Sequence, residues 1–281
     1  MQSTSNRPII VVSWDGLTAP LSFIQQDAKA DFDFFIFDYS GIDHRSIIMD
    51  FTTTFYLSKK TECKGDLIQA IYTFLLENNH KSFPYIGLLD DDILISISDL
   101  NKILFIANTE KLDVFQASLT HDSYYQHRQF IHKAGYLIQS TQWVEIMAPF
   151  YSNDVFFEAG KEFNRSISGT GIDVYLVPTI QVLLGKTKTA VVHAVQMKHC
   201  RPIRTDNRIF VNGKDNLTEI SELQAYCKSL VNNNIAKFDP EFVKEVIDRK
   251  YIYGIPLKHK INRLSRLFTN LYRFIVDESY R

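Results

Sequence analysis

Short hydrophobic runs alternate with amphipathic segments through roughly the first 120 residues of the chain. The runs at residues 9–13 and 32–38 are rich in β-branched and aromatic residues, a composition typical of strands. Residues 66–79 carry Leu67, Ile71 and Phe74 at the spacing of one helix face. The expected order is strand 9–13, helix 17–30, strand 32–38, helix 66–79, strand 85–89, a helix capped by Ser98, and strand 114–118.

The second half of the chain has a less regular pattern. Residues 134–138 and 143–147 predict two strands flanking a turn, and a helix should run from Ser152 to Phe163. A glycine-rich turn at residues 168–171 precedes a strand at 190–192. Beyond that point the pattern predicts only helices, at residues 217–231, 240–250 and 257–276. We therefore expect a main domain over residues 1–210 and a helical C-terminal extension over 211–281.

Alternating strands and helices indicate an α/β fold with a mixed, mostly parallel sheet flanked by helices. Ligands of such sheets bind at the carboxyl ends of the strands. Asp15, Asp38 and the run Asp90–Asp91–Asp92 each follow the end of an expected strand. These carboxylates should therefore meet at one edge of the sheet.

Three adjacent aspartates repel one another unless a cation compensates their charge. If they continue the strand, Asp90 and Asp92 share a face and Asp91 points away. Two converging carboxylates suit Mg²⁺ or Mn²⁺, which bind through one or two carboxylates together with substrate phosphates. The other interpretation is a solvated acidic turn, although the apolar residues on both sides of the run disfavour it.

Two other metal-dependent classes fit the aspartates less well. A phosphatase of the haloacid-dehalogenase type carries Gly-Thr after its second aspartate, whereas Ile93 and Leu94 stand here. A polymerase-like nucleotidyltransferase would need a Gly-Ser turn and a helix before its aspartates, and the sequence has neither.

The overall composition of the chain excludes several classes of binding partner and site. The 281 residues have a formal net charge of −1, so the whole molecule is no electrostatic match for nucleic acid. Three widely spaced cysteines predict neither a disulfide framework nor a zinc site, and a reduced cytoplasmic location is expected. No run approaches the length of about 18 apolar residues that a membrane span needs.

The middle of the chain, roughly residues 83–200, contains in order YIGLLDDDI, QWVEIMAPFYS, SGTGIDVYL and VVHAVQMKH. These segments resemble a family of GT-A-type glycosyltransferases from plants and bacteria. The resemblance implies a GT-A-like (nucleotide-diphospho-sugar transferase) fold and a metal-dependent enzyme that uses a nucleotide sugar. His193 stands where the family pattern has aspartate, which leaves its role open.

The resemblance also implies roles for individual residues. Asp90 and Asp92 match the family's Asp-x-Asp ligands for Mn²⁺ or Mg²⁺ and the donor diphosphate, and Asp91 would lie nearer the donor ribose or sugar. His199 matches a distal histidine that completes the metal or diphosphate site, and imidazole is a suitable ligand beside carboxylates. A polar residue satisfied by its neighbours is the other interpretation of His199.

Two further carboxylates are candidates for the acceptor side. Asp173 ends the turn Gly169-Thr-Gly-Ile-Asp and is similar to the general base of inverting GT-A enzymes, although Ile172 replaces a glutamate of that motif. A helix N-cap would also explain Asp173. Glu145 lies in an apolar segment, where a carboxylate needs a partner. An acceptor sugar or a buried arginine would both serve.

GT-A enzymes bind the nucleotide at the ends of the first two strands. The resemblance therefore implies that Trp14 or Tyr39 stacks on uracil and that Asp15 or Asp38 forms hydrogen bonds with it. Core aromatics and turn aspartates are the more ordinary roles for these residues. Lys64 resembles a basic position on the donor side.

Residues 257–276 predict a helix with apolar residues along one face and lysine and arginine residues on the rest of its surface. Such a helix either closes the domain or lies on an anionic membrane at its inner face, which would suit a lipid-linked acceptor. The sequence thus favours a glycosyltransferase that moves a sugar from a nucleotide-sugar donor, with UDP favoured, to a glycan or glycolipid hydroxyl. Inversion and retention both remain open. The alternatives are a catalytically silent GT-A-like binding module and a metal-dependent phosphohydrolase.

Overall fold

A computed structural model describes residues 7–48, 53–78, 82–203 and 208–234 of the chain. The chain divides into two compact units, residues 1–233 and 234–281, and almost all described residues belong to the first. The helices predicted at 240–250 and 257–276 lie outside the described residues.

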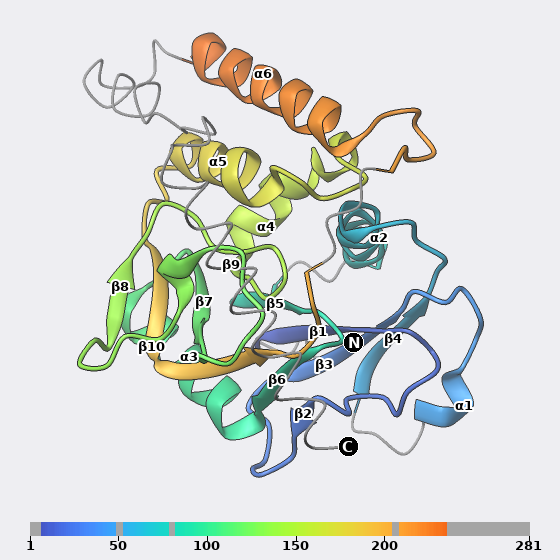
Figure 1. Cartoon of the computed structure of the whole chain (residues 1–281), viewed down its shortest axis with the longest axis vertical. Coiled ribbons are helices and arrows are strands. Elements are labelled where there is room, and N and C mark those ends of the chain that lie inside the picture. The colour runs from blue at the N-terminus through green and yellow to red at the C-terminus, as the bar shows by residue number, and fades with distance from the viewer. Residues whose placement is uncertain (1–6, 49–52, 79–81, 204–207, 235–281) are drawn as a thin grey trace. The chain divides into compact units, whose positions relative to one another are not determined.

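The centre of the described unit is a mixed sheet, shown in Figure 1. Its strands follow the order β2-β6-β10-β7-β9-β5-β1-β3-β4, and β8 pairs with β10. Strands β5, β1, β3 and β4 are parallel neighbours, whereas β9 is antiparallel to both β5 and β7. The bounds are β1 Ile9–Trp14, β2 Ile24–Gln25, β3 Asp33–Asp38, β4 Thr53–Ser58, β5 Tyr85–Leu89, β6 Ile93–Ser96, β7 Val114–Leu119, β8 Ile138–Ser140, β9 Phe150–Ser152 and β10 Thr189–His199.

Both faces of β1, β3 and β5 are buried, as is usual for parallel sheets. Successive residues of β3 point to opposite faces. Phe34 joins the hydrophobic cluster of α3 residues such as Ile103, and Phe35 contacts Phe74 of α2 with ring centroids 5.1 Å apart. The helices are α1 Arg45–Ile48, α2 Lys64–Glu77, α3 Ile97–Glu110, α4 Asn153–Gly160, α5 Val177–Leu183 and α6 Asn216–Asn234, with a π-helix at Ile172–Leu176 before α5.

The structure confirms the main strand and helix predictions of the N-terminal half. Strands β1, β3, β5 and β7 and helix α2 lie within one or two residues of their predicted positions. The fold class is mixed α/β with a mostly parallel sheet flanked by helices, also as predicted. Helix α3 starts at Ile97, because the Ser96 hydroxyl, not that of Ser98, accepts the hydrogen bond from the Asp99 backbone N–H.

Three predicted elements are wrong. The strand expected at 134–138 is mostly a turn, and strand β8 starts only at its last residue, Ile138. Residues 17–30 form turns and the short strand β2 instead of a helix, because the Asp15 carboxylate accepts from the backbone N–H groups of Leu17 and Thr18 and Pro20 has no N–H to donate. Residues 143–147 are not a strand. The Glu145 backbone N–H donates instead to the side chain of Gln116.

Among the described residues, no helix combines the length and the hydrophobicity needed to cross a bilayer. Helix α6 belongs to the same compact unit as the sheet up to Asn233. Its Glu219 accepts hydrogen bonds from the glycine-rich turn at residues 166–171. The division of the chain at residue 210 therefore stays a prediction, and α6 packs against the sheet-bearing part.

Candidate functional site

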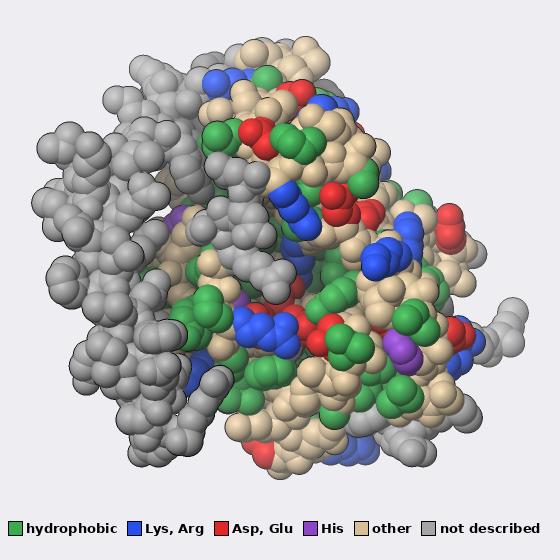
Figure 2. All heavy atoms as spheres, turned by 45° about the vertical axis from the view of Figure 1, so that its right-hand side comes forward, with side chains coloured by type: hydrophobic (Ala, Val, Ile, Leu, Met, Phe, Trp, Pro, Cys, Tyr) green, Lys and Arg blue, Asp and Glu red, His purple; other side chains and the backbone are tan. Residues whose placement is uncertain are grey.

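Strands β1, β3 and β5 are parallel, so their carboxyl ends meet at one edge of the sheet. A cavity of about 390 Å³ opens at this edge, within the size range of small-molecule sites. Figure 2 shows acidic, basic and histidine side chains gathered in a hollow on this face. The lining residues are Tyr39, Asp90, Asp91, Asp92, Gln126, His127, Glu145, Ile146, Met147, Asp173, His199, Arg201, Pro202 and Ile203.

The three aspartates lie in the turn between β5 and β6 and not in a strand. Strand alternation therefore does not set their directions, and each carboxylate has its own partner. Asp90 pairs with Lys64. Asp91 accepts from the Tyr39 hydroxyl at 2.7 Å and from Arg201 at 2.9 Å. Asp92 lies 3.3 Å from His199 Nε2.

These partners compensate the repulsion that the sequence predicts. Burial raises the pKa of Asp90, and the neighbouring Lys64 opposes that shift. The phenol of Tyr39 has a raised pKa, first from burial and then from its hydrogen bond to Asp91. Four charged or titratable groups, Lys64, Tyr39, Arg201 and His199, thus hold the acidic turn together. Two of them, Lys64 and Arg201, are cations that a phosphate ligand could also recruit.

Asp92 and His199 form the part of the site best suited to a metal ion. Asp92 is only 8% exposed, and its Oδ1 has no hydrogen-bond partner among the described residues. His199 Nδ1 lies 2.8 Å from the Tyr124 carbonyl oxygen and must donate to it. His199 Nε2 therefore presents either a proton or a lone pair towards Asp92. A lone pair beside a carboxylate is the donor set of a divalent cation.

Among the described residues, no group of three or more His, Cys, Asp and Glu side chains is arranged to hold a metal ion. Mg²⁺ and Mn²⁺ sites commonly use one or two protein ligands and take the rest from substrate phosphates and water. Asp92 and His199 fit that sparse type of site. Metal binding at these residues stays a prediction.

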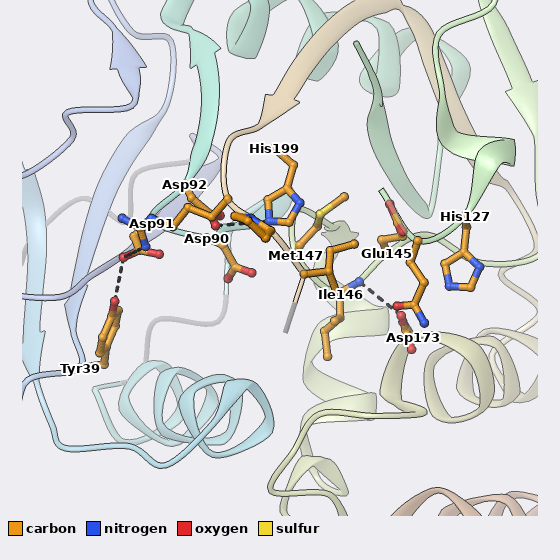
Figure 3. A pocket seen from close by; sticks show the side chains of 14 residues that line it. Tyr39, Asp90, Asp91, Asp92, His127, Glu145, Ile146, Met147, Asp173 and His199 are labelled. Carbon is orange, nitrogen blue, oxygen red and sulfur yellow. Dashed lines mark hydrogen bonds and ion pairs between the residues drawn. The ribbon is translucent and has the colours of Figure 1, made fainter. Parts of the chain in front are cut away.

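Glu145 and Asp173 form a second acidic pair at the other end of the cavity, as Figure 3 shows. Asp173 lies in the first turn of the π-helix and accepts from the Ile146 backbone N–H at 3.3 Å. Glu145 is 7% exposed, and its Oε2 has no hydrogen-bond partner among the described residues. Burial raises the pKa of Asp173 to about 7. Burial and the charge of Asp173 raise the pKa of Glu145 to about 8.

A neighbouring cavity of about 230 Å³ extends the site towards α2. It shares Tyr39, Asp90 and Asp91 with the first cavity, so the two form one groove along the sheet edge. Its remaining lining residues are Ser13, Thr61, Glu62, Cys63, Lys64 and Leu67. The groove therefore places Lys64 at one end and the Glu145–Asp173 pair at the other.

The fold of the chain has counterparts in solved structures. No family model and no curated protein matches the chain. The structure of S. aureus TarS residues 1–349 in complex with UDP-GlcNAc matches with a TM-score of 0.56 and 10% identity, over 89% of this chain and 74% of that one. The same protein in complex with UDP matches with a TM-score of 0.53 and 11% identity, over 89% and 73%.

The fold is GT-A-like. A structure of S. aureus TarS that includes more of that protein also matches, with a TM-score of 0.53 and 10% identity over 90% of this chain and 45% of that one. At these identities the likeness concerns the fold alone. The resemblance found in the sequence is therefore supported at the level of the GT-A-like fold, and its motif-by-motif roles stay predictions.

Three residues predicted to contact the nucleotide have structural partners and line neither cavity of the groove. The buried Trp14 donates its indole N–H to the Thr18 carbonyl oxygen. Asp15 holds the turn that follows it. Asp38 is fully buried against His44 and Tyr56. Their contacts with a nucleotide stay a prediction that this arrangement does not favour.

His193, whose role the sequence left open, lies away from the groove. It is buried on β10, and its ring nitrogens face the Lys133 backbone N–H and the Gln139 side chain. Burial lowers the pKa of this imidazole, which keeps it neutral. We conclude that His193 serves the packing of β10.

Sequence reasoning missed Arg201, Gln126 and His127, which all line the cavity. Arg201 had a signal, because three adjacent carboxylates demand cations and this arginine follows His199 by two residues. Gln126 and His127 come from the loop after β7, and nothing in the local sequence distinguishes that loop from an ordinary connection.

Proposed function

We propose that this protein is a glycosyltransferase that moves a sugar from a nucleotide-sugar donor, with a UDP-sugar favoured, to a hydroxyl of a glycan or glycolipid. One observation carries the proposal. A single groove at the carboxyl edge of a GT-A-like sheet joins the Lys64–Asp90 and Arg201–Asp91 pairs to the buried Glu145–Asp173 pair. Phosphate-binding cations and a candidate base are thus within one site.

The donor diphosphate would bind beside the acidic turn. Lys64 and Arg201 both face the groove and now neutralise carboxylates, so each can share its charge with a phosphate. Tyr39 lines both cavities and is available to the ribose or base. Asp91, between Tyr39 and Arg201, would contact the ribose or sugar.

Asp92 and His199, with Asp90 close by, are the residues that would hold Mn²⁺ or Mg²⁺. The unpaired Oδ1 of Asp92 and the fixed donor role of His199 Nδ1 support this assignment. The ion, when bound, would neutralise charge that develops on the departing diphosphate.

Asp173 is our candidate for the general base. In the transfer step the acceptor oxygen forms a bond to the anomeric carbon, and the bond from that carbon to the diphosphate oxygen breaks. The bonding electrons leave with the nucleoside diphosphate, and the acceptor proton passes to Asp173. A pKa of about 7 suits a base that works near neutrality. Attack from the face opposite the diphosphate would invert the anomeric centre.

Glu145 would assist on the acceptor side. With its pKa raised to about 8, its carboxyl is protonated at neutral pH and can donate a hydrogen bond to an acceptor oxygen. No arginine takes up the buried Oε2 in the described part of the chain, so the arginine-pair alternative has no support.

The proposal also includes a prediction from the sequence. The helix predicted at 257–276, which lies outside the described residues, would face the membrane, and the acceptor would then be lipid-linked at the inner face of that membrane. The division into a catalytic domain and a helical extension also belongs to this proposal.

A screen of nucleotide sugars for Mn²⁺-dependent release of the nucleoside diphosphate tests the function. We expect turnover of at least one donor by the wild type and loss of turnover in Asp173→Asn, with UDP affinity retained. A silent binding module would bind UDP in calorimetry and turn over nothing. A phosphohydrolase, which the GT-A-like fold does not favour, would release phosphate regardless of acceptor. Undiminished transfer by Asp173→Asn would reject the assigned base.

A further inference from the structure

Glu219 is a fully buried carboxylate that lines neither cavity of the groove. It lies in the first turn of α6. Its Oε1 accepts from the Ile167 backbone N–H at 2.9 Å and from the Asn212 amide at 2.8 Å. Its Oε2 accepts from the Ser168 backbone N–H at 2.9 Å and from the Ser166 hydroxyl at 3.2 Å. Both oxygens are thus used to hold one loop, residues 166–171.

This loop contacts the donor end of the groove. The Gly65 and Asp66 backbone N–H groups both donate to the Ile167 carbonyl oxygen, at 3.0 and 3.2 Å. A Cβ atom on Gly65 would lie 1.8 Å from the Ser166 carbonyl oxygen, so the loop and α2 touch backbone to backbone. Gly65 directly follows Lys64, the partner of Asp90. The position of the loop therefore sets the position of Lys64.

The same loop leads into the acceptor end of the groove. Gly169 and Gly171 have φ angles of +84° and +88°, which only glycine adopts readily. The Ile172 backbone N–H donates to the Gly169 carbonyl oxygen, and the π-helix that carries Asp173 begins there. A Cβ atom on Gly169 would also approach Ile146, whose backbone N–H binds Asp173.

A buried carboxylate is a costly way to hold a loop unless every lone pair is used. Here two backbone N–H groups, an amide and a hydroxyl supply the donors. An amide side chain of the same shape accepts at one oxygen only. Glutamine at this position would leave at least one backbone N–H of the loop facing another donor.

We propose that Glu219 is a positioning residue. It lies outside the groove and, through the loop at residues 166–171, fixes the positions of Lys64 and Asp173 relative to each other. The proposal rests on the proposed function for its catalytic consequence, because Lys64 and Asp173 are the assumed donor cation and base. The structural half of the proposal, that Glu219 holds the loop at residues 166–171, depends on the hydrogen bonds alone. Glu219 would act on catalysis only through the loop at residues 166–171.

Hydrogen–deuterium exchange of the full chain tests the structural half without any substrate. In Glu219→Gln we expect the amides of residues 64–67 and 166–174 to exchange at least about tenfold faster, while β1 and β5 keep their wild-type rates. Glu222→Gln is the matched control, because Glu222 lies on the same helix and pairs with Lys214 at the surface. Wild-type exchange in the loop, or faster exchange throughout the sheet, would overturn the proposal.

Kinetics with a turned-over donor test the catalytic half. We expect kcat of Glu219→Gln to fall about tenfold or more, with a smaller rise in the donor KM. The acid limb of the pH profile should move to lower pH, because a loosened loop admits water to Asp173. Glu145 and Tyr151, which interact electrostatically with Asp173, are unchanged in this variant. An unshifted profile with wild-type kcat would overturn the proposal.

A second variant guards against misfolding. Ser166→Ala removes one of the four hydrogen bonds to Glu219, together with the contacts of the same hydroxyl to Thr170 and Ser168, and should give the same pattern of exchange with a smaller amplitude. If the wild type turns over no donor, the proposed function fails, and exchange in these variants still decides whether Glu219 holds the loop.

Discussion

His199 Nε2 lies 3.3 Å from Asp92 Oδ2, while Nδ1 of the same ring is fixed as a donor by the Tyr124 carbonyl oxygen. A proton or a metal ion must therefore lie between His199 Nε2 and the Asp92 carboxyl oxygen, because two lone pairs would otherwise face each other. Burial lowers the pKa of His199, but the hydrogen bond and charge of Asp92 outweigh burial and raise this pKa, which favours a proton on the ring. A divalent cation would replace that proton.

Asp92→Asn should abolish the Mn²⁺ dependence of UDP binding. The substitution removes the negative charge that faces His199 and would bind the ion, and it replaces one of the two carboxylate oxygens by an amide NH2 group that cannot bind a cation. Titration calorimetry with UDP, with and without Mn²⁺, measures the effect. Asp122→Asn, at an exposed carboxylate that pairs with Lys198, should leave binding unchanged. Equal Mn²⁺ dependence in Asp92→Asn and the wild type would remove the metal assignment.

Arg201→Gln should weaken UDP binding by about tenfold, which corresponds to about 1.4 kcal/mol. The guanidinium faces the cavity and neutralises Asp91, so its loss leaves an uncompensated carboxylate beside the diphosphate. The deficit should shrink at high salt, because screening weakens the repulsion. Arg7→Gln breaks another arginine–aspartate pair, that with Asp33, outside the groove, and should not change the affinity. A salt-independent or absent deficit would argue against a phosphate contact.

Asp173→Asn should lower kcat by about 10² to 10⁴-fold, the usual contribution of a general base. In the wild type, kcat/KM should rise with pH through about 7, because Asp173 must ionise before it accepts a proton. It should fall again above about 8 as Glu145 loses the proton that it donates. The two limbs belong to the pair and not to single residues. Initial rates from pH 5 to 9 measure the profile, and a flat one would contradict the assignment.

Much of the sheet edge is predictable from the sequence because it depends on local pattern. Strands β1, β3 and β5 are short apolar runs with an aspartate at or just after the end, and parallel pairing then brings these ends together. The helix expected at 17–30 failed because a side-chain-capped turn at Asp15 competes with helical periodicity. The spacing of apolar residues along the sequence does not, by itself, reveal such a turn.

The pairing of Glu145 with Asp173 could not be predicted, because it depends on tertiary structure. Residues 143–147 look like a strand since they are apolar, yet they belong to none of the strands, and the Glu145 backbone N–H donates to the Gln116 side chain. The same holds for Glu219. A glutamate in the first turn of a polar helix is ordinarily a solvated residue.

Gly65→Ala should destabilise the protein, which is the opposite of the usual gain from replacing a helix glycine. The new Cβ would lie 1.8 Å from the Ser166 carbonyl oxygen, so the loop at residues 166–171 must move. We expect a loss of about 2 kcal/mol or more in urea unfolding. Glu77→Ala, at the exposed end of the same helix, should change stability by less than about 0.5 kcal/mol. A stabilised Gly65→Ala would show that the close approach does not exist.

Asp173→Asn should stabilise the fold at neutral pH while it removes activity. The pKa of Asp173 rises from 3.8 to about 7 on folding, so the folded state holds its proton more tightly than the unfolded chain. Ionisation therefore favours unfolding, and the wild type loses stability as the pH rises from about 4 to about 7. Asparagine does not ionise and avoids the loss, which amounts to about 2 to 4 kcal/mol.

Urea unfolding at pH 4.5, 6 and 7.5 measures this difference. The stability advantage of Asp173→Asn over the wild type should be small at pH 4.5 and largest at pH 7.5. Asp154→Asn, at a mostly exposed carboxylate on α4, should show no such growth with pH. If Asp173→Asn were less stable than the wild type at pH 7.5, the Asp173 carboxylate would be stabilised in the folded state, and the raised pKa that suits it to act as a base would be refuted.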